Sequence, residues 1–272
     1  EIYTLSLHDA LPIFDPHLKA LFEEGKVDEK VIDGLVRNVL RLKFRLGLFD
    51  NPYVDMKRAN QFYAPESLEA AERMVEESTV LLKNNGVLPF TGKKVALVGP
   101  MADAKHDQNG TWCFDLDKTH TVTPLETLRQ TLGDNLVFEP ELTYSRDKSE
   151  EGIRKAVEAA KQADIVVMVA GEEAVLSGEA HCRADLSLPG AQTEMLKALK
   201  ATGKPVVLVV MAGRPLTISQ EVDLADATLF MFHPGTMGGP ALAKLLAGEA
   251  VPSGKLPMSF PRMAGQEPMY YN

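Results

Sequence analysis

The sequence contains few cysteines, one tryptophan and no long hydrophobic run. Two cysteines, Cys113 and Cys182, are too few for a disulfide framework, and without a CxxC pair or a histidine cluster there is no candidate metal site. No apolar stretch reaches the roughly 18 residues that a membrane-spanning helix needs. No basic segment followed by an apolar core indicates a signal peptide. We therefore expect a soluble chain that uses no metal or other cofactor.

The charge balance is acidic. The chain has 38 Asp and Glu residues against 29 Lys and Arg residues, a formal net charge of -9. Nucleic acid and anionic membranes repel such a chain, so we exclude both as partners and keep neutral or cationic small molecules. With 45% hydrophobic residues, the 272-residue chain has enough apolar material for one large domain, or for one domain and a fragment of another.

The N-terminal third of the chain differs in character from the rest. Residues 1–13 resemble translated adapter or linker sequence, and we leave them out of the fold prediction. Apolar residues at helical spacing predict amphipathic helices over 28–47 and over 65–85. The segment 49–64 between them holds Pro52, is followed by Pro65 and has no strong period, which indicates a linker. Residues 14–89 are thus predicted to form two helices and a linker.

Residues 90–272 alternate short apolar runs with helical segments. The predicted strands are 95–98, 136–138, 165–170, 206–211 and 228–232. The predicted helices are 124–132, 150–162, 191–201 and 238–247. Apolar strands with helices between them are typical of sheets buried on both faces. The sequence therefore predicts an α/β fold with a doubly wound, mostly parallel sheet flanked by helices, an α/β sandwich.

The loop after the third predicted strand is rich in ionisable side chains: Glu172, Glu173, Glu179, His181 and Arg183. In open α/β sheets, ligands bind at the carboxyl ends of the strands. A carboxylic acid there can protonate a leaving oxygen if burial raises its pKa, and a nearby arginine can order the loop or lower the pKa again. The loop residues alone leave two interpretations open, an acid–base group and an ordinary surface carboxylate.

Other motifs in the sequence are less specific. Trp112 lies in a polar loop on the carboxyl side of a strand, where its indole could stack on a sugar ring or fill a domain interface. The turns at 98–103 and 234–239 lack the residues of dinucleotide-binding and phosphate-binding loops, and no GxSxG elbow is present. Because Cys113 and Cys182 both fall in loops after strands, their thiols are either free or close enough to pair.

Five strings occur in the order and spacing of a known family: RNVLRLKFRLGLFDNPY, ESTVLLKNNGVLPF, KKVALVGPMAD, ALKATGKPVVLVVMAGRPL and PSGKLPMSFPR. From Asp15 to its end, the sequence resembles glycoside hydrolase family 3 β-glucosidases, particularly the bacterial periplasmic type. The resemblance implies a (β/α)8 barrel joined to an α/β sandwich, with the active site between them and the helix over 28–48 as the last of the barrel. It also implies a β-glucoside or oligosaccharide as substrate and a periplasmic or secreted location.

The family is similar in using two carboxylates, an Asp nucleophile on the barrel and a Glu acid/base on a sandwich loop. Such a pair, about 5 Å apart, supports a retaining mechanism. The string SGEAHCR matches the acid/base segment, which places that role on Glu179, with the two glutamates directly after the strand as alternatives. By the same resemblance, Trp112 lines the sugar entrance and Arg183 orders the loop. His181 beside them is a further substrate-binding candidate.

The sequence also departs from the family pattern. The nucleophile segment of the SDW type is absent, and so are the barrel residues that hold the sugar. His233 stands where many relatives have an aromatic residue, and the given sequence ends at Asn272, where a fibronectin-like domain often follows in the family. Since the covalent step needs the nucleophile, we expect no double-displacement turnover by this chain alone.

The preferred hypothesis is a fragment of a retaining β-glucosidase that hydrolyses terminal β-D-glucosyl residues and carries the acid/base half of the site. One alternative is a glycan-binding α/β module without turnover. Another is a hydrolase with repurposed chemistry, in which Glu179 works with Asp103, Asp115 or Asp117. The apolar faces of the helices before Pro89 must fold back on the sandwich or meet another copy of the chain, and we predict self-association.

Overall fold

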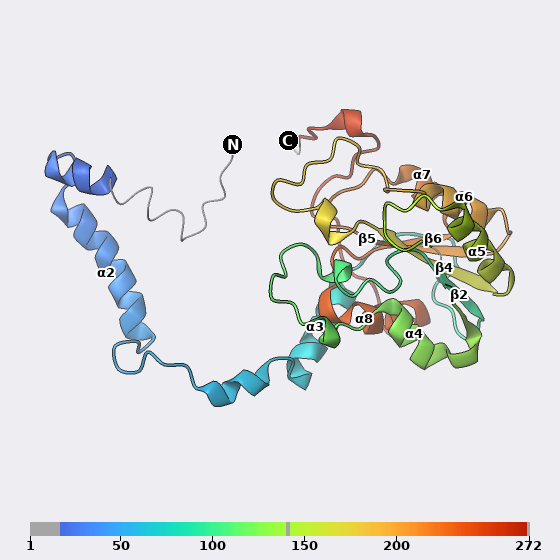
Figure 1. The fold of residues 1–272 in the computed structure, drawn as a ribbon, viewed down its shortest axis with the longest axis horizontal. Coiled ribbons are helices and arrows are strands. Elements are labelled where there is room, and N and C mark those ends of the chain that lie inside the picture. Colours follow the sequence, from blue (N-terminus) through green and yellow to red (C-terminus); the bar gives the residue numbers. More distant parts are fainter. Residues whose placement is uncertain (1–16, 140–141, 271–272) are drawn as a thin grey trace. The chain divides into compact units, whose positions relative to one another are not determined.

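The computed structural model describes residues 17–139 and 142–270, and the chain divides into two compact units, Glu1–Gln61 and Phe62–Asn272 (Figure 1). The prediction for residues 1–13 lies outside the described residues. In the first unit, a helix over 17–23 precedes α2 (Glu29–Arg45) and the 3-10 helix η1 (Met56–Gln61).

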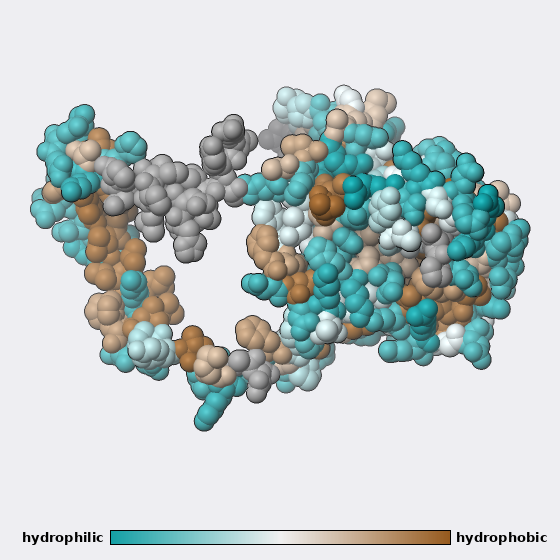
Figure 2. Space-filling view, in the orientation of Figure 1, coloured by the Kyte–Doolittle hydropathy of each residue, from teal (hydrophilic) through white to brown (hydrophobic). Residues whose placement is uncertain are grey.

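Helix α2 forms where the sequence predicts it. The Asp28 carboxylate accepts a hydrogen bond from the backbone N–H of Lys30, which caps the first turn, and Lys43 and Arg45 lie in the last turn. None of the α2 residues is buried. Figure 2 shows apolar side chains along this helix, and the exposed ones include Val31, Leu35, Val39, Leu42 and Leu46.

The second unit is built on a six-stranded sheet. Its strands are β1 (Val80–Asn84), β2 (Val95–Val98), β3 (Leu136–Val137), β4 (Ile165–Gly171), β5 (Val206–Met211) and β6 (Ala227–Phe230). The spatial order is β1-β6-β5-β4-β2-β3. Every neighbouring pair is parallel except β1 with β6. The predicted doubly wound, mostly parallel sheet is therefore confirmed.

Helices cover both faces of the sheet (Figure 1). On one face lie α3 (Pro65–Ser78), α4 (Pro124–Leu132) and α8 (Gly238–Ala247). On the other lie α5 (Glu150–Lys161), α6 (Gln192–Lys200) and α7 (Ser219–Leu224). Alternate residues of each strand point to opposite faces, so Ala96 and Val98 of β2 join one core, and Val95 and Leu97 join the other. Burial on both faces explains the continuous apolar runs.

The prediction of one helix over 65–85 is wrong beyond Ser78. The Thr79 hydroxyl donates to the carbonyl of Val75 and its backbone turns extended, and the next residues form β1, which pairs antiparallel with β6. One strand of the sheet, β1, therefore lies before residue 90, where the predicted sandwich begins. Helix α7 was not predicted either.

The order of the strands places a ligand-binding position between β2 and β4. The chain leaves β2 for β3 on one side and then returns to β4 on the other, so the helices that follow β2 and β4, α4 and α6, lie on opposite faces of the sheet. Most of the 3-10 helices lie in loops at the carboxyl edge of the sheet. They are η2 (Asp107–Asn109), η3 (Lys118–His120), η5 (Ala174–Leu176) and η6 (Gly235–Met237), while η4 (Gly133–Asn135) and η7 (Ala264–Gln266) lie elsewhere.

Candidate active site

The loops that follow β2 and β4 are joined directly at the carboxyl edge. The Thr111 hydroxyl contacts the carbonyl oxygens of Ala174 and Ser177, the latter at 2.6 Å. The Asp107 carboxylate accepts a hydrogen bond of 2.9 Å from the backbone N–H of Ala174. Because both contacts engage main-chain atoms near the start of the β4 loop, the two loops hold one another in place.

Glu179 lies in the middle of the β4 loop and is half-buried. Among the residues that the structure describes, its carboxylate has no hydrogen-bond or ion-pair partner. The backbone on either side adopts positive φ, +112° at Gly178 and +63° at Ala180. A side chain at position 178 would collide with Thr111, so the glycine is needed there. The backbone of this segment therefore has a defined conformation, while no group among the described residues binds the Glu179 carboxylate.

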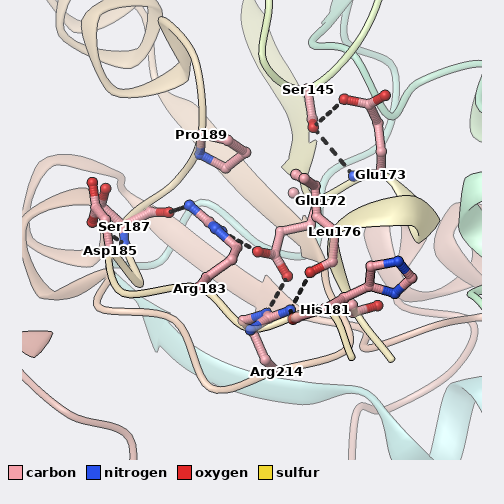
Figure 3. Close-up of polar contacts among 12 residues, drawn as sticks. Ser145, Glu172, Glu173, Leu176, His181, Arg183, Asp185, Ser187, Pro189 and Arg214 are labelled. Carbon is pink, nitrogen blue, oxygen red and sulfur yellow. Dashed lines mark hydrogen bonds and ion pairs between the residues drawn. The ribbon is translucent and has the colours of Figure 1, made fainter. Parts of the chain in front are cut away.

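Glu172, the first alternative, is held in a different way. Its side chain has no exposed surface, and its two carboxylate oxygens are ion-paired with Arg183 and Arg214 (Figure 3). The Arg214 Nε lies 3.0 Å from Oε2 of Glu172. A buried carboxylate with both oxygens bound to guanidinium groups has no oxygen left to present to a ligand. This geometry disfavours Glu172 as a proton donor to a ligand.

Glu173, the second alternative, is also engaged. Its carboxylate accepts hydrogen bonds from the Ser145 hydroxyl at 2.8 Å and from Arg146 at 3.0 and 3.1 Å. Partial burial raises the pKa of Glu173, but the hydrogen bonds from Arg146 and Ser145 outweigh this effect, and the pKa lies below its ordinary value. A carboxyl group held ionised in this way is poorly suited to general-acid work.

Arg183 and His181 lie on the same loop with unlike surroundings. Arg183 pairs with Glu172 and also donates to the carbonyl of Ser187 at 3.1 Å, so its guanidinium is directed into the protein. The His181 side chain is exposed, and its backbone carbonyl accepts a hydrogen bond of 3.1 Å from Arg214. The structure thus places His181 at the surface of the loop and Arg183 underneath it.

Trp112 lies on the β2 loop next to the residue that joins the two loops. Its side chain is 60% exposed, and that of Phe114 is 82% exposed. The two rings meet edge to face, with their centroids 6.1 Å apart. Rings this exposed are not filling a core, and they offer apolar contact area to a ligand at this edge.

His233 follows β6 and fills the space beneath the loops. A side chain on Gly110 or on Gly213 would collide with its ring. Burial lowers the pKa of His233, against a smaller opposing effect of Asp107. Its Nδ1 atom is buried without a hydrogen-bond partner among the described residues. His233 is therefore a partly buried packing residue, and its lowered pKa favours the neutral imidazole.

The thiols of Cys113 and Cys182 are both free. Cys113 donates to the carbonyl of Asn109 at 3.1 Å, and Cys182 is exposed. Of the two interpretations that the sequence left open, the structure has the unpaired one. Over residues 17–139 and 142–270, the structure has no group of three or more His, Cys, Asp or Glu side chains arranged to hold a metal ion.

Two residues that matter for this geometry escaped the sequence analysis, Arg214 and Gln192. The Gln192 side-chain amide donates to the carbonyls of Gly171 and Pro189, and its oxygen accepts from the Gly171 N–H at 2.8 Å. It therefore ties together the two ends of the β4 loop. Arg214 lies three residues after the end of β5 in the motif MAGRPL, and a charged residue so close to a buried strand end is the signal that could have identified it.

A family model for the glycosyl hydrolase family 3 C-terminal domain matches residues 79–272. The chain belongs to glycosyl hydrolase family 3. Among its family 3 relatives, the periplasmic β-glucosidase of Salmonella typhimurium is 37% identical over 95% of this chain and 38% of its own length. A β-xylosidase of Formosa agariphila is 34% identical over 89% of this chain and 35% of its own length.

Solved structures of family 3 proteins share this fold. The β-glucosidase from Listeria innocua in complex with glucose superposes with a TM-score of 0.84 at 38% identity, covering 94% of this chain and 35% of that one. The chain spans little more than a third of the length of these relatives. None of the helices that the structure describes is both long enough and apolar enough to cross a membrane.

Proposed function

We propose that this chain carries the acid/base half of a retaining β-glucosidase site, with Glu179 as the proton-transferring group. One observation supports this role above all. Of the three glutamates in the β4 loop, Glu172 and Glu173 are tied up by arginines, and only Glu179 lacks such a partner among the described residues. A general acid must present its proton to the ligand and exchange it with water, which an arginine-bound carboxylate does poorly.

The proposed reaction takes two steps. The Glu179 carboxylic acid gives its proton to the glycosidic oxygen as the bond to the anomeric carbon breaks, while a second carboxylate bonds to that carbon. The Glu179 carboxylate then accepts a proton from the water that releases the sugar. This chain supplies only the first of the two carboxylates in the proposal, and the nucleophile belongs to the longer family 3 proteins.

The neighbouring residues have separate parts in this proposal. Trp112 and Phe114 offer apolar faces to a sugar ring, and His181 presents a polar side chain from the loop surface. Arg183 acts through the loop, because its guanidinium is occupied by Glu172 and by the Ser187 carbonyl. The substrate in the proposal is a terminal β-D-glucosyl residue of a glucoside or an oligosaccharide.

The exposed aromatic pair favours a second candidate, a glycan-binding module without turnover. Trp112 is the only tryptophan of the chain, so its fluorescence reports on this edge of the sheet alone. If the loops bind sugar, titration with glucose or cellobiose should change the fluorescence saturably, and Phe114→Ala should weaken the binding because one face of contact is lost. Tyr270→Ala, which removes an exposed aromatic side chain elsewhere, is the matched control.

Hydrolysis assays separate the alternatives. We expect the chain alone to leave aryl β-glucosides intact, because it supplies no nucleophile for the covalent step. Saturable sugar binding without turnover would fit both the half-site and the binding module. Turnover of a glucoside or an aryl ester that disappears in Glu179→Gln would instead establish the repurposed hydrolase and contradict the half-site proposal.

Self-association is a further part of the proposal. Removing the exposed apolar side chains of α2 from water lowers the free energy of the system, so concentrated samples should contain dimers or larger species. In sedimentation or light scattering over a wide concentration range, the average mass should rise with concentration. The double variant Leu35→Glu with Leu42→Glu should remain monomeric, whereas Arg37→Glu, on the opposite side of α2, should associate like the parent. A concentration-independent monomer mass for the parent would contradict the prediction.

We propose a periplasmic or secreted location for the protein. The name of the Salmonella typhimurium relative supports it, as does the likeness of the two chains over 95% of this one. An extracytoplasmic location also suits a hydrolase of glycosides that reach the cell from outside.

A further inference from the structure

The β4 loop is attached to the sheet through one buried carboxylate. Glu172 is the first residue after β4, and its side chain has no exposed surface. Arg183 binds one of its oxygens and Arg214 the other, and each arginine side chain is only 16% exposed (Figure 3). The guanidinium groups thus meet the carboxylate away from water, where ion pairs are strongest.

Both arginines also hold the main chain of the loop. The Arg214 guanidinium donates to the carbonyl oxygens of Leu176 and His181, which flank Glu179 on its two sides. Arg183 donates to the carbonyl of Ser187, farther along the loop. The three carbonyls therefore fix the path of the chain before and after Glu179, and the buried carboxylate fixes the two arginines.

We propose that Glu172 and Arg214, together with Arg183, form a positioning device that sets the place of the Glu179 carboxyl group. This inference rests on the proposed acid/base role of Glu179 and names residues that act through the loop. Arg214 is central to it, because it comes from the β5 loop and links a neighbouring strand end to both sides of Glu179. Catalytic groups supported in this way act with little reorganisation when substrate binds.

The two arginines offer little surface for a direct contact with substrate, because each side chain is only 16% exposed. Arg214 uses its Nε for Glu172 and one terminal nitrogen for two carbonyls. Arg183 uses one terminal nitrogen for Glu172 and the other for Ser187. Both arginines are therefore positioning residues. The positive φ of Ala180 also indicates that the loop is held in place, since a non-glycine residue stays in this region of φ only where its surroundings hold it.

The test compares loop mobility in the full chain for Arg214→Met and Arg214→Lys. Methionine keeps the aliphatic stem and removes the charge, while lysine keeps a cation near Glu172 but lacks the planar fork that reaches two carbonyls. In hydrogen–deuterium exchange, we expect the loop amides over 176–187 of Arg214→Met to exchange about tenfold faster or more, with β5 protected as before. The lysine variant should fall between Arg214→Met and the parent.

A spin label on the exposed Cys182 gives a second, spectroscopic readout, in a background with Cys113→Ser. Release of the loop should give a faster-tumbling label in Arg214→Met, with partial recovery in the lysine variant. Arg146→Met is the matched control, because it breaks an arginine–carboxylate pair at the adjacent Glu173 without touching the three carbonyls. It should leave both readouts at the parent values.

Three outcomes would overturn the inference: an unchanged loop in Arg214→Met, an equal loosening in Arg146→Met, or a loss of protection in β5 together with the loop. If Arg214→Met does not fold, the lysine variant tests the inference alone. A rigid loop in Arg214→Lys would show that the planar guanidinium is not needed to hold the loop. These readouts involve no turnover. Hydrolysis that does not depend on Glu179 would thus refute the proposed function while the loop result stands, and a rigid loop would refute the positioning device alone.

Discussion

Replacing Glu179 with Gln is expected to slow aryl β-glucoside hydrolysis by about 100-fold to 10,000-fold in a protein that supplies the nucleophile. A suitable protein is a hybrid in which residues 62–272 of this chain replace the matching segment of the Listeria innocua β-glucosidase, whose sequence is 38% identical. Glutamine keeps the size and most of the polarity of the side chain, but it cannot give a proton to the leaving oxygen. The loss therefore measures proton transfer.

The leaving group provides the diagnostic. An acidic phenol such as dinitrophenol departs without protonation, so the Glu179→Gln hybrid should hydrolyse its glucoside far better than that of an alkyl alcohol or an unsubstituted phenol. Glu173→Gln is the matched control. Glu173 lies on the same loop as Glu179, but its carboxylate is bound to Arg146. Equal losses for acidic and basic leaving groups, or a comparable leaving-group dependence in Glu173→Gln, would contradict the assignment of Glu179.

Replacing Gly171 with Ala is expected to destabilise the second unit by about 3 to 5 kcal/mol, at the upper end of single substitutions. Gly171 ends β4 with φ at +148°, and a Cβ atom there would lie 1.8 Å from the carbonyl oxygen of Met211 on β5. The backbone cannot move aside easily, because Gln192 bonds both the N–H and the carbonyl of Gly171. Urea denaturation followed by circular dichroism would measure the loss, which should lower the thermal midpoint by roughly 10 °C.

Gly203→Ala is the control for this substitution. Gly203 also has positive φ, at +76°, but no atom lies within 4 Å of a Cβ built there. It should therefore show only the backbone penalty of about 1–2 kcal/mol for a left-handed residue. The difference between the two variants isolates the collision with β5. If Gly171→Ala proves no worse than Gly203→Ala, the close approach of the two strands does not hold in solution.

The regular part of the fold was predictable because its causes are local. The apolar runs of β2, β4, β5 and β6 and the amphipathic spacing of α4, α5, α6 and α8 each lie within one short segment. Strand β1 was missed because its sequence continues the helical spacing of α3, and only pairing with the distant β6 makes it a strand. Helix α7 has six residues, too few for a periodic signal.

In the candidate site too, local sequence features were predictable and long-range contacts were not. The loop with Glu179 could be located from its place after a buried strand and from the string SGEAHCR. The sequence could not rank its three glutamates by their surroundings, because the arginines that bind Glu172 and Glu173 come from positions 183, 214 and 146. Which carboxylate is paired depends on how β4, β5 and the neighbouring loops meet, and such contacts have no pattern along the chain.

The arginine contacts to Leu176, His181 and Ser187 have an evolutionary consequence, because each of them ends on a peptide oxygen. Peptide oxygens are present whatever amino acid is encoded, so the support of the loop survives replacement of the side chains that it displays. Positions 181 and 182, whose side chains are exposed, are consequently open to substitution, and laboratory libraries confined to them should yield many folded members. Substrate preference can then diversify on a scaffold that does not have to be rebuilt each time.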